Sequence, residues 1–419
     1  MKTLKRILLI LLCAALVFAL ASCKKADAED KSTPENGGST EAAEAGGAEE
    51  SEIAPIDEPI EEEPKEYVYK TYDFDESTFV EYEGTVEHIF FHQVVAYPEL
   101  AFDGDDKAHG IDDWMCTIPE FLAIMDNLYE KGYILMDMND VWSEYEDENG
   151  KPFMMQNTIR IPEGRKPFVM SFDDICYYEY MLTNGFTHKL IVGDDGEIWS
   201  YGIDPDGNEV ISQDLDIVTL LDKYVREHPD FSLNGAKACL ALTGYEGILG
   251  YRTNTDTRGT AYYDEAFRQT EIEAVKPVIE QLKRTGWYFG CHTWGHIRLD
   301  NKSVEKVQAD MTRWMNEVGS LVGETSLMFY PHGARPDGDD VKQTGAVFKY
   351  LHSLGFRVFA SVGINSFSKI KTDISAVICD RLHPDGTTLR WSRKLYLQFY
   401  DAKEVYDYAN RPDYGYDFS

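Results

Sequence analysis

The stretch Phe168-Val169-Met170-Ser171-Phe172-Asp173-Asp174 decides the fold, because it is an apolar run that ends in two adjacent carboxylates. A second stretch has the same design: the apolar residues Trp287-Tyr288-Phe289 lead to His292-Thr293-Trp294-Gly295-His296. Short apolar runs of this kind predict buried strands. In α/β folds the carboxyl ends of parallel strands meet at one rim, so we expect the acidic pair and the two histidines to lie together.

Apolar runs alternate with amphipathic segments on both sides of these stretches, from Val86 to Cys379. A helix is predicted over 119–131, since Thr117 and Glu120 have the spacing of a capping box and Gly132 follows the last turn. The other expected strands cover 89–92, 133–136, 238–242, 327–330, 357–362 and 376–379, and the other expected helices cover 271–284, 304–322 and 341–354. This succession predicts an α/β fold, either a parallel barrel or a doubly wound sheet.

An insertion is expected at about 177–235, between the two motif-bearing strands. Asp194-Asp195-Gly196 and Asp204-Pro205-Asp206-Gly207 are typical turns between hydrophobic runs, which predicts a small β insertion at the rim. The second of these turns could also be interpreted as a calcium loop. It lacks the remaining ligand spacing of such a loop, so a plain turn is the better interpretation.

The first residues are typical of an export signal. Lys2, Lys5 and Arg6 precede the apolar run 7–20, which is short for a membrane span. Leu20-Ala21-Ser22-Cys23 resembles a bacterial lipobox, in which the cysteine is acylated; an ordinary signal peptide or a signal anchor is the alternative. We therefore expect a lipoprotein signal peptide over 1–22 and an extracytoplasmic protein that is anchored to a bacterial membrane through lipid on Cys23.

The segment 23–66 is predicted to be a disordered linker. Residues 24–66 include no aromatic side chain and carry 15 acidic against 4 basic residues. Such a segment cannot bury enough apolar surface to offset its ordering entropy, and its charges repel one another. The linker should hold a catalytic domain, 67–419, away from the membrane, and a monomer is expected.

Composition excludes some classes of function. The net charge of −34 argues against nucleic acid as a partner, because phosphate binding requires basic patches. Beyond Cys13 and Cys23 the number of cysteines is odd and no C-x-x-C spacing occurs, which argues against a disulfide framework or a zinc ribbon. Buried free thiols are predicted for Cys116, Cys176, Cys239, Cys291 and Cys379.

The two motifs together indicate a hydrolytic metal site. Two imidazoles and one carboxylate can bind a divalent ion and leave open positions, while the second carboxylate remains available as a base. A metal lowers the pKa of a bound water, and a neighbouring base removes its proton. An Asp-Asp pair alone is usually a cap or a turn, and His-x-x-x-His alone often occurs without metal, but their joint occurrence at strand ends favours a metal site.

These residues carry a resemblance to a family. Ser171-Phe172-Asp173-Asp174, His292-Thr293-Trp294-Gly295-His296 and Tyr330-Pro331-His332-Gly333 resemble three ordered motifs of the polysaccharide deacetylases, which are metal-dependent carbohydrate esterases on a distorted (β/α) barrel. Ile89-Phe90-Phe91-His92 followed by Gly132-Tyr133 is most similar to the poly-N-acetylglucosamine deacetylase branch. The resemblance implies Asp174, His292 and His296 as ligands of zinc or another divalent transition metal, and Asp173 as the general base.

The chain departs from the family pattern at two places. Many members have an arginine that orients the base, and this chain has Phe329 there; Arg252, Arg335 or Arg381 could replace it. The late Leu-x-His motif, which supplies the general acid, is not clear either. His92 matches the early acid position of the poly-N-acetylglucosamine branch, and His383 loosely matches the late motif. We favour His92, whose alternative role is that of a core histidine at a strand end.

The leading hypothesis is a metal-dependent hydrolase that removes N-acetyl groups from a cell-surface or extracellular polysaccharide. A non-catalytic carbohydrate-binding lipoprotein on the same fold is the second hypothesis, motivated by the missing arginine and the unclear late motif. An O-acetyl polysaccharide esterase is the third, because it would use the same site and differ only in the leaving group.

Overall fold

The computed structural model describes residues 71–255, 264–336 and 344–413. The predicted signal peptide and linker lie outside these ranges, as do the first three residues of the helix expected over 341–354. Within the described ranges, no helix combines the length and the apolar character needed to span a bilayer.

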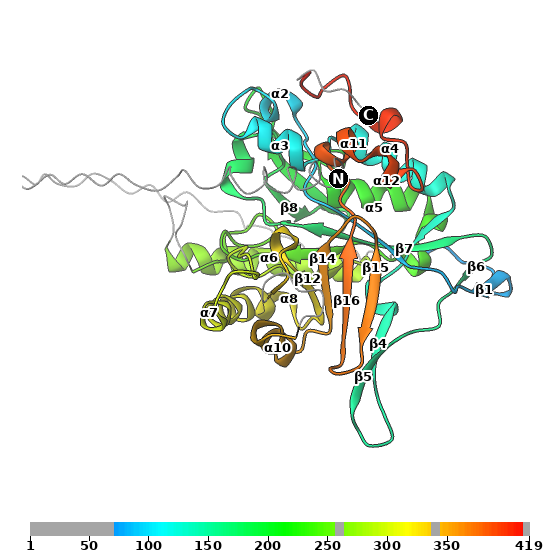
Figure 1. Cartoon of the computed structure of the whole chain (residues 1–419). Helices are drawn as coiled ribbons and strands as arrows, with labels where there is room; N and C mark the ends of the chain where they lie inside the picture. Colours follow the sequence, from blue (N-terminus) through cyan, green and yellow to red (C-terminus); the bar gives the residue numbers. More distant parts are fainter. Residues whose placement is uncertain (1–70, 256–263, 337–343, 414–419) are drawn as a thin grey trace, which may run out of the picture. The chain divides into compact units, whose positions relative to one another are not determined.

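Seven parallel strands follow one another around a barrel, in the order β2 (Glu87–Phe91), β7 (Lys166–Asp173), β11 (Cys239–Leu242), β12 (Tyr288–Cys291), β13 (Leu327–Phe329), β14 (Val358–Val362) and β16 (Ala376–Arg381). Figure 1 labels β7, β12, β14 and β16 of this set. The residue that follows β16 returns to the first strand. The N–H of Phe90 donates to the carbonyl of Leu382, and the N–H of Leu382 donates to the carbonyl of His88, both at 2.9 Å. The predicted (β/α) barrel is therefore confirmed.

Strand alternation separates the interior of the barrel from the side that faces the helices. One buried apolar cluster contains alternate residues of successive strands, among them Val169, Ala241, Phe329, Ala360 and Cys379. The residues between them, such as Met170, Leu240, Met328 and Phe359, belong to a larger cluster that also includes the helices. Ser171, Asp173 and Arg381 continue the first pattern toward the carboxyl ends of β7 and β16, so their side chains face the interior beneath the rim.

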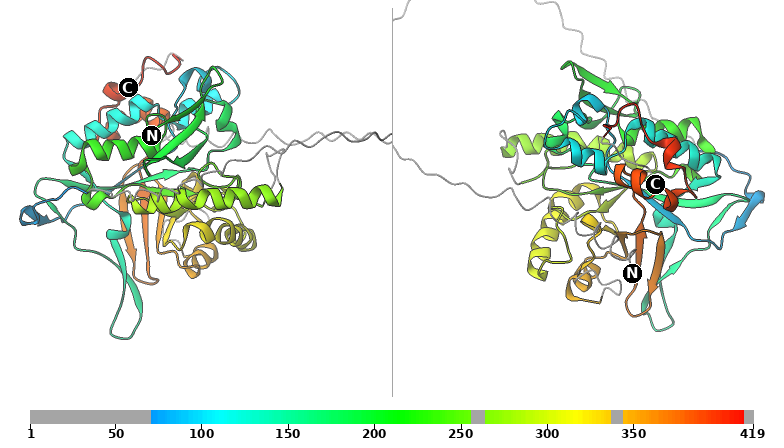
Figure 2. Two further views of the ribbon diagram at one scale, coloured as in Figure 1. Left: turned by 180° about the vertical axis from the view of Figure 1, so that it is seen from behind. Right: turned by 45° about the horizontal axis from the view of Figure 1, so that its top comes forward.

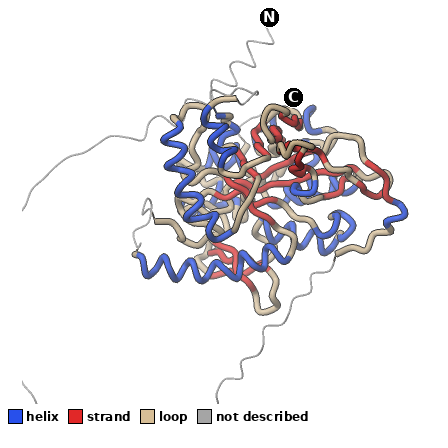
Figure 3. Tube along the Cα trace, turned by 90° about the horizontal axis from the view of Figure 1, so that it is seen from below, coloured by secondary structure: helices blue, strands red, loops and turns tan. Residues whose placement is uncertain are grey.

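Helices lie around the strands (Figures 2 and 3). One group consists of α4 (Ile118–Glu130), α5 (Ile217–Glu227) and the short C-terminal helices α11 (Gly386–Trp391), α12 (Arg393–Tyr396) and α13 (Ala402–Val405). The other consists of α6 (Glu265–Arg284), α7 (Val304–Trp314), α8 (Ser320–Val322) and α10 (Ala346–Ser353). The capping box predicted for α4 is present, with the Glu120 carboxylate accepting the N–H of Thr117 at 3.0 Å.

The helix expected over 341–354 begins at Ala346, after the described residues 344 and 345. Two other predicted helices differ from the observed ones because of local hydrogen bonds. Helix α6 begins at Glu265 rather than at Glu271, because Asp264 caps it by accepting the N–H of Phe267 at 2.7 Å. The expected helix over 304–322 is interrupted by a π-helical segment, Met315–Gly319, between α7 and α8. Both differences arise from local hydrogen bonding that apolar periodicity does not reveal.

The predicted β insertion is present as an antiparallel sheet of β8 (Lys189–Val192), β9 (Ile198–Ile203) and β10 (Glu209–Ser212). Asp204–Gly207 is the turn between β9 and β10, where the N–H of Gly207 donates to the carbonyl of Asp204. The buried Asp216 carboxylate ties this region to the barrel, because it accepts hydrogen bonds from Gln93, Tyr177 and Thr187 at 2.6–2.8 Å. The insertion is thereby held beside the ends of β2 and β7.

Several shorter elements were not predicted. These are β1 (Phe79–Glu81), β4 (Trp142–Glu146), β5 (Pro152–Gln156), β6 (Arg160–Pro162), β15 (Phe367–Lys371), α2 (Pro98–Ala101) and α3 (Ala108–Trp114). The longer helix α5, inside the expected insertion, was not predicted either. Strand β3 (Tyr133–Leu135) was predicted, as 133–136, and pairs with the start of β7. The β4–β5 hairpin projects away from the barrel (Figure 1). All five cysteines of the described residues are buried and free, as predicted.

Candidate active site

The acidic pair lies at the carboxyl end of β7. Asp173 is the last residue of the strand and faces the interior of the barrel, and Asp174 follows it in the left-handed conformation, with φ of 62°. This conformation is uncommon for a residue with a β-carbon, and here it breaks the strand alternation so that both carboxylates reach the same rim. Both side chains are buried, with 2% and 9% of their residues' surface exposed.

The two histidines are placed by the loop that follows β12. Thr293 and His296 are also left-handed, with φ of 57° and 50°. Asp310 of α7 holds the loop between the histidines by accepting the N–H groups of Trp294 at 2.7 Å and Gly295 at 2.9 Å. A β-carbon at Gly295 would lie 2.9 Å from Oδ2 of Asp310, which explains why glycine occupies that position.

Asp174, His292 and His296, which we call the candidate metal site, are brought together as predicted. Nε2 of His296 lies 3.7 Å from Oδ2 of Asp174, and Nε2 of His292 lies 4.0 Å from Oδ1 of the same carboxylate. One ligand atom from each of the three residues lies within 4.8 Å of the others. This spacing suits a single ion held between a carboxylate oxygen and two imidazole nitrogens.

The chemistry of the three donors also fits a divalent cation. Nδ1 of His292 donates to the carbonyl of Phe329 at 2.9 Å, which leaves the lone pair of Nε2 directed into the site. Burial lowers the pKa of both imidazoles to about 4, so they are neutral at neutral pH. Burial raises the pKa of Asp174, and within the described residues no lysine or arginine forms an ion pair with it.

Arg381 holds the second carboxylate. Its Nη1 and Nη2 donate to Oδ1 and Oδ2 of Asp173 at 2.6 and 2.9 Å, and the guanidinium lies 4.0 Å from the ring centre of Phe90. Burial by itself would raise the pKa of Asp173, but Arg381 and His292 hold that pKa well below its usual range. Of the three arginines that could orient the base, Arg381 is therefore the one in place.

The other two arginines serve elsewhere. Arg252 donates to the carbonyls of Tyr177 and Glu246, at 2.8 and 2.9 Å, and so fixes the loop that follows the acidic pair. Arg335 forms an ion pair with Asp380, which precedes Arg381 in the chain and points to the opposite side of the strand. Among the described contacts, neither arginine reaches Asp173.

His88 is a site residue that the sequence analysis missed. Its Nε2 lies 2.9 Å from the hydroxyl of Ser171, and that hydroxyl accepts a hydrogen bond from Arg381 at 3.1 Å. Burial lowers the pKa of His88 well below its ordinary value, so the ring is neutral beside the guanidinium. The sequence feature that could have identified His88 is the two-residue period along β2, which places His88, Phe90 and His92 on one face.

His92 and His383, the two candidates for the general acid, lie next to each other. Nε2 of His92 lies 3.9 Å from Oδ2 of Asp174, and Nδ1 of His92 lies 3.0 Å from Nε2 of His383. Burial, together with the neighbouring His383, lowers the pKa of His92 well below its ordinary value. His92 therefore faces the candidate metal site, and His383 lies behind it.

The aromatic residues of the rim divide into packing and accessible side chains. Trp294 donates its indole N–H to Glu317 at 2.8 Å and is buried, as are Tyr251 and Tyr330. Tyr245 remains partly exposed and stacks on Tyr178 with a ring separation of 4.9 Å. Of these four, Tyr245 is the one whose ring a ligand can reach. His332 is exposed on the turn Pro331–Gly333, with its ring 4.4 Å from that of His296.

These features define a class of protein: a parallel α/β barrel with an Asp–His–His cluster, beside an arginine-held carboxylate, at the carboxyl ends of its strands. Residues 245–358 match the family model described as polysaccharide deacetylase. The predicted resemblance to this family is confirmed over that segment, while the similarity to the poly-N-acetylglucosamine branch stays a prediction. The matched segment contains His292 and His296, whereas the acidic pair precedes it.

Solved structures similar to this chain include the Streptococcus pyogenes deacetylase PplD in complex with acetate, which is 11% identical with a TM-score of 0.39. That match covers 74% of this chain and 94% of the other. BC0361, a polysaccharide deacetylase from Bacillus cereus, is 14% identical with a TM-score of 0.37, and the match covers 71% of this chain and 64% of the other. A comparison with curated proteins finds no match.

Proposed function

We propose that this protein is a metal-dependent deacetylase that removes N-acetyl groups from a cell-surface or extracellular polysaccharide. The proposal rests on two groups of residues, the candidate metal site and the Asp173–Arg381 pair, which lie together at one rim of the barrel. Asp174, His292 and His296 offer an ion three ligands, and Asp173 lies beside them in a buried pair with Arg381. The match to the polysaccharide deacetylase family model supports the same reaction.

Each group has one task in this proposal. A divalent ion bound at the candidate metal site, with zinc favoured by the donor set, would lower the pKa of water and polarise the acyl oxygen. Asp173 removes a proton from the attacking water, and Arg381 fixes the orientation of its carboxylate. His92 protonates the departing amine through Nε2. The backbone N–H of His332 is a second donor for the acyl oxygen.

Loss of a proposed metal ligand should abolish both metal binding and activity. Asp174→Asn and His292→Ala remove one of three ligands, so we expect stoichiometric zinc to be lost and acetate release to fall at least about 10²-fold. Metal content by elemental analysis and acetate release from chitooligosaccharides are the measurements. His109→Ala, which removes an exposed imidazole, is the matched control. Retention of tightly bound zinc in both ligand variants would contradict the proposed ligand set.

Tyr178 should tune the affinity of the same site. Its hydroxyl donates to Oδ1 of Asp174 at 2.7 Å and lies 2.7 Å from the hydroxyl of Thr243. Tyr178→Phe removes this support, and we expect zinc affinity to fall about tenfold, measured by competition with a chromogenic chelator. Tyr180→Phe, in the neighbouring ring, is the control. Equal affinity in Tyr178→Phe and the wild type would show that this hydrogen bond does not orient the ligand.

The alternatives are separated by acetate release from a panel of acetylated glycans with several divalent metals. Release from N-acetylated glucosamine polymers supports the proposal, and the poly-N-acetylglucosamine branch in particular. Release confined to O-acetylated xylan-like polymers would identify an esterase. Binding of metal and sugar without release would identify a carbohydrate-binding lipoprotein. One reason for that last alternative was that the arginine expected to orient the base is absent from its usual position. Arg381 pairs with Asp173, so this reason no longer applies.

The proposed location follows from the N-terminal sequence. Lipid on Cys23 would anchor the chain to a bacterial membrane, and the acidic linker up to residue 66 would let the domain, 67–419, reach polymer outside the cell. Metabolic labelling with a palmitate analogue, compared between the wild type and Cys23→Ser, tests the anchor. Label that persists in Cys23→Ser would place the lipid elsewhere.

A further inference from the structure

The side chains of Asp385, His383 and His92 form a line of hydrogen bonds that ends at the candidate metal site. Oδ2 of Asp385 lies 2.8 Å from Nδ1 of His383, and Nε2 of His383 lies 3.0 Å from Nδ1 of His92. The remaining ring nitrogen, Nε2 of His92, lies 3.9 Å from Asp174. Both nitrogens of both rings are thus accounted for, and His383 reaches the site only through His92.

The outer part of this line is held rigidly. His383 and Asp385 are 7% and 2% exposed, and the imidazole of His383 stacks on Phe90 with a ring separation of 4.2 Å. The carbonyl of His383 accepts hydrogen bonds from Tyr396 and Thr388, at 2.8 and 2.7 Å. The second oxygen of Asp385 caps α11 by accepting the N–H of Thr388 at 2.6 Å.

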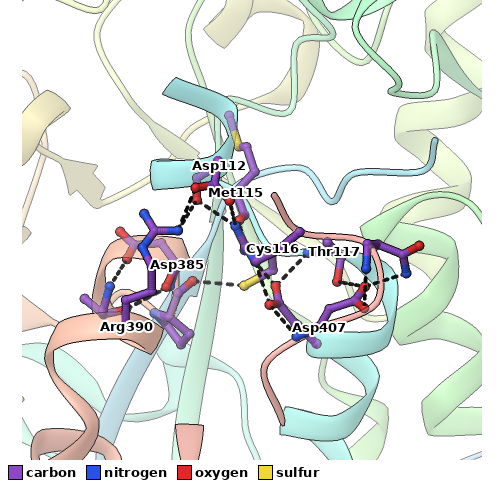
Figure 4. Close-up of polar contacts among 12 residues, drawn as sticks. Asp112, Met115, Cys116, Thr117, Asp385, Arg390 and Asp407 are labelled. Atoms are coloured by element: carbon purple, nitrogen blue, oxygen red, sulfur yellow. Dashed lines mark hydrogen bonds and ion pairs between the residues drawn. The ribbon is translucent and has the colours of Figure 1, made fainter. Parts of the chain in front are cut away.

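A buried ionic network lies next to this loop (Figure 4). The thiol of Cys116 donates to the carbonyl of Pro384 at 3.3 Å. Arg390, in the helix that Asp385 caps, pairs with Asp112 at 2.8 Å, and both side chains are almost completely buried. The loop that carries His383 and Asp385 is therefore fastened to the segment around α3, so neither side chain is free to turn toward solvent.

The order of the hydrogen bonds follows from the chemistry of the end group. A carboxylate can only accept, so Nδ1 of His383 carries a hydrogen and donates to Asp385. In neutral His383 the other nitrogen, Nε2, is then an acceptor, and it receives the hydrogen on Nδ1 of His92. Nε2 of His92 is thereby left as the nitrogen that faces the site, where it can bind or release a proton without disturbing the line.

We propose that His383 and Asp385 are positioning residues that act through His92, fixing its ring so that Nε2 is the nitrogen that delivers a proton to the leaving group. The proposal rests on the proposed function, because it assigns this proton to the departing amine of an N-acetylated sugar. It also gives the loosely matching late histidine a role without making it the acid.

Asp173 takes one proton from the attacking water, whose oxygen bonds to the acyl carbon. Nε2 of His92 enters the step with a second proton, taken up from solvent. As the carbon–nitrogen bond breaks, the nitrogen keeps the bonding electrons and receives that proton from Nε2 of His92. Asp173 then loses its proton to solvent, and His92 regains one, so the products are the free amine and acetic acid.

The test compares two leaving groups. An amine must be protonated to depart, whereas 4-nitrophenolate departs without a proton. His383→Gln and Asp385→Asn should therefore lower kcat on an N-acetylated oligosaccharide about 10²-fold and change kcat on 4-nitrophenyl acetate less than threefold. Asp401→Asn is the matched control, because Asp401 caps α13 in the same C-terminal segment but has no contact with His383. Equal losses on both substrates would mean a structural role only and would overturn the proposal.

A second measurement does not depend on activity. Nitrogen-15 chemical shifts of the histidine rings in the metal-free protein should place the hydrogen of His383 on Nδ1, and Asp385→Asn should move it to Nε2, because the amide can donate. A wild-type hydrogen on Nε2 would overturn the proposal. If the wild type bound zinc but released no acetate from any N-acetylated glycan, the proposed function would fail, and the ring shifts would still decide the order of the hydrogen bonds.

Discussion

Asp173→Asn is expected to lower kcat for acetate release about 10³-fold while bound zinc stays at the wild-type level. Asparagine has the shape of aspartate and keeps an oxygen that can accept from Arg381, but its amide cannot take a proton from water. Asp173 is not among the three residues of the candidate metal site, although Nε2 of His292 lies 3.7 Å from its Oδ2. Steady-state kinetics on a chitooligosaccharide, with elemental analysis of the same samples, measures both quantities.

The matched control for this variant is Asp380→Asn. Asp380 is also a buried carboxylate paired with an arginine, yet its partner is Arg335 and its side chain lies on the other side of β16. Its replacement should change kcat less than threefold at temperatures where the protein stays folded. Full activity in Asp173→Asn would remove Asp173 from the mechanism, and loss of zinc would make it a ligand rather than a base.

Arg381→Met is expected to destabilise the protein by about 3–5 kcal/mol and to reduce activity strongly. Methionine fills part of the volume between Phe90 and Phe329, but the Asp173 carboxylate then lies buried without its cation. The free energy of unfolding, from urea titrations of metal-free samples, measures the loss. Arg381 lowers the pKa of Asp173 below the ordinary 3.8, so the pair stabilises the fold above that pH, and the difference between variant and wild type should shrink in stronger acid.

The double variant Asp173→Asn with Arg381→Met provides the decisive comparison. Removing both charges leaves no unpaired ion in the interior, so the double variant should be more stable than Arg381→Met alone by at least about 1 kcal/mol. Additive losses from the two single variants would show that the pair is not coupled, despite the two short hydrogen bonds between them.

The residues of the candidate metal site could be predicted because their signal is local. Each motif follows directly after an apolar run, and strand ends in a parallel barrel necessarily share a rim. Arg381 could be named as one of three candidates but not selected, because it lies 208 positions after Asp173 and meets it only through closure of the barrel. The same closure brings His383 against His92 across 291 positions. Pairing of this kind depends on strand order and register, which apolar patterns do not specify.

Other features of the structure were not predicted from the sequence for different reasons. His88 was not predicted as a site residue, although its place on β2 puts it on the same face as His92. The C-terminal helices are only four to six residues long, too short for a helical period to be recognised. A buried ion pair of Arg390 with Asp112 helps to hold the first of them. The start of α6 depended on a single capping aspartate.

The meeting of the first and last barrel strands also sets an order of events in the cell. A chain is made from its N-terminus, so His92, both carboxylates and both histidines of the candidate metal site exist well before Arg381 and His383 emerge from the ribosome. The contacts of Arg381 with Asp173 and of His383 with His92 can therefore form only when nearly the whole chain is present.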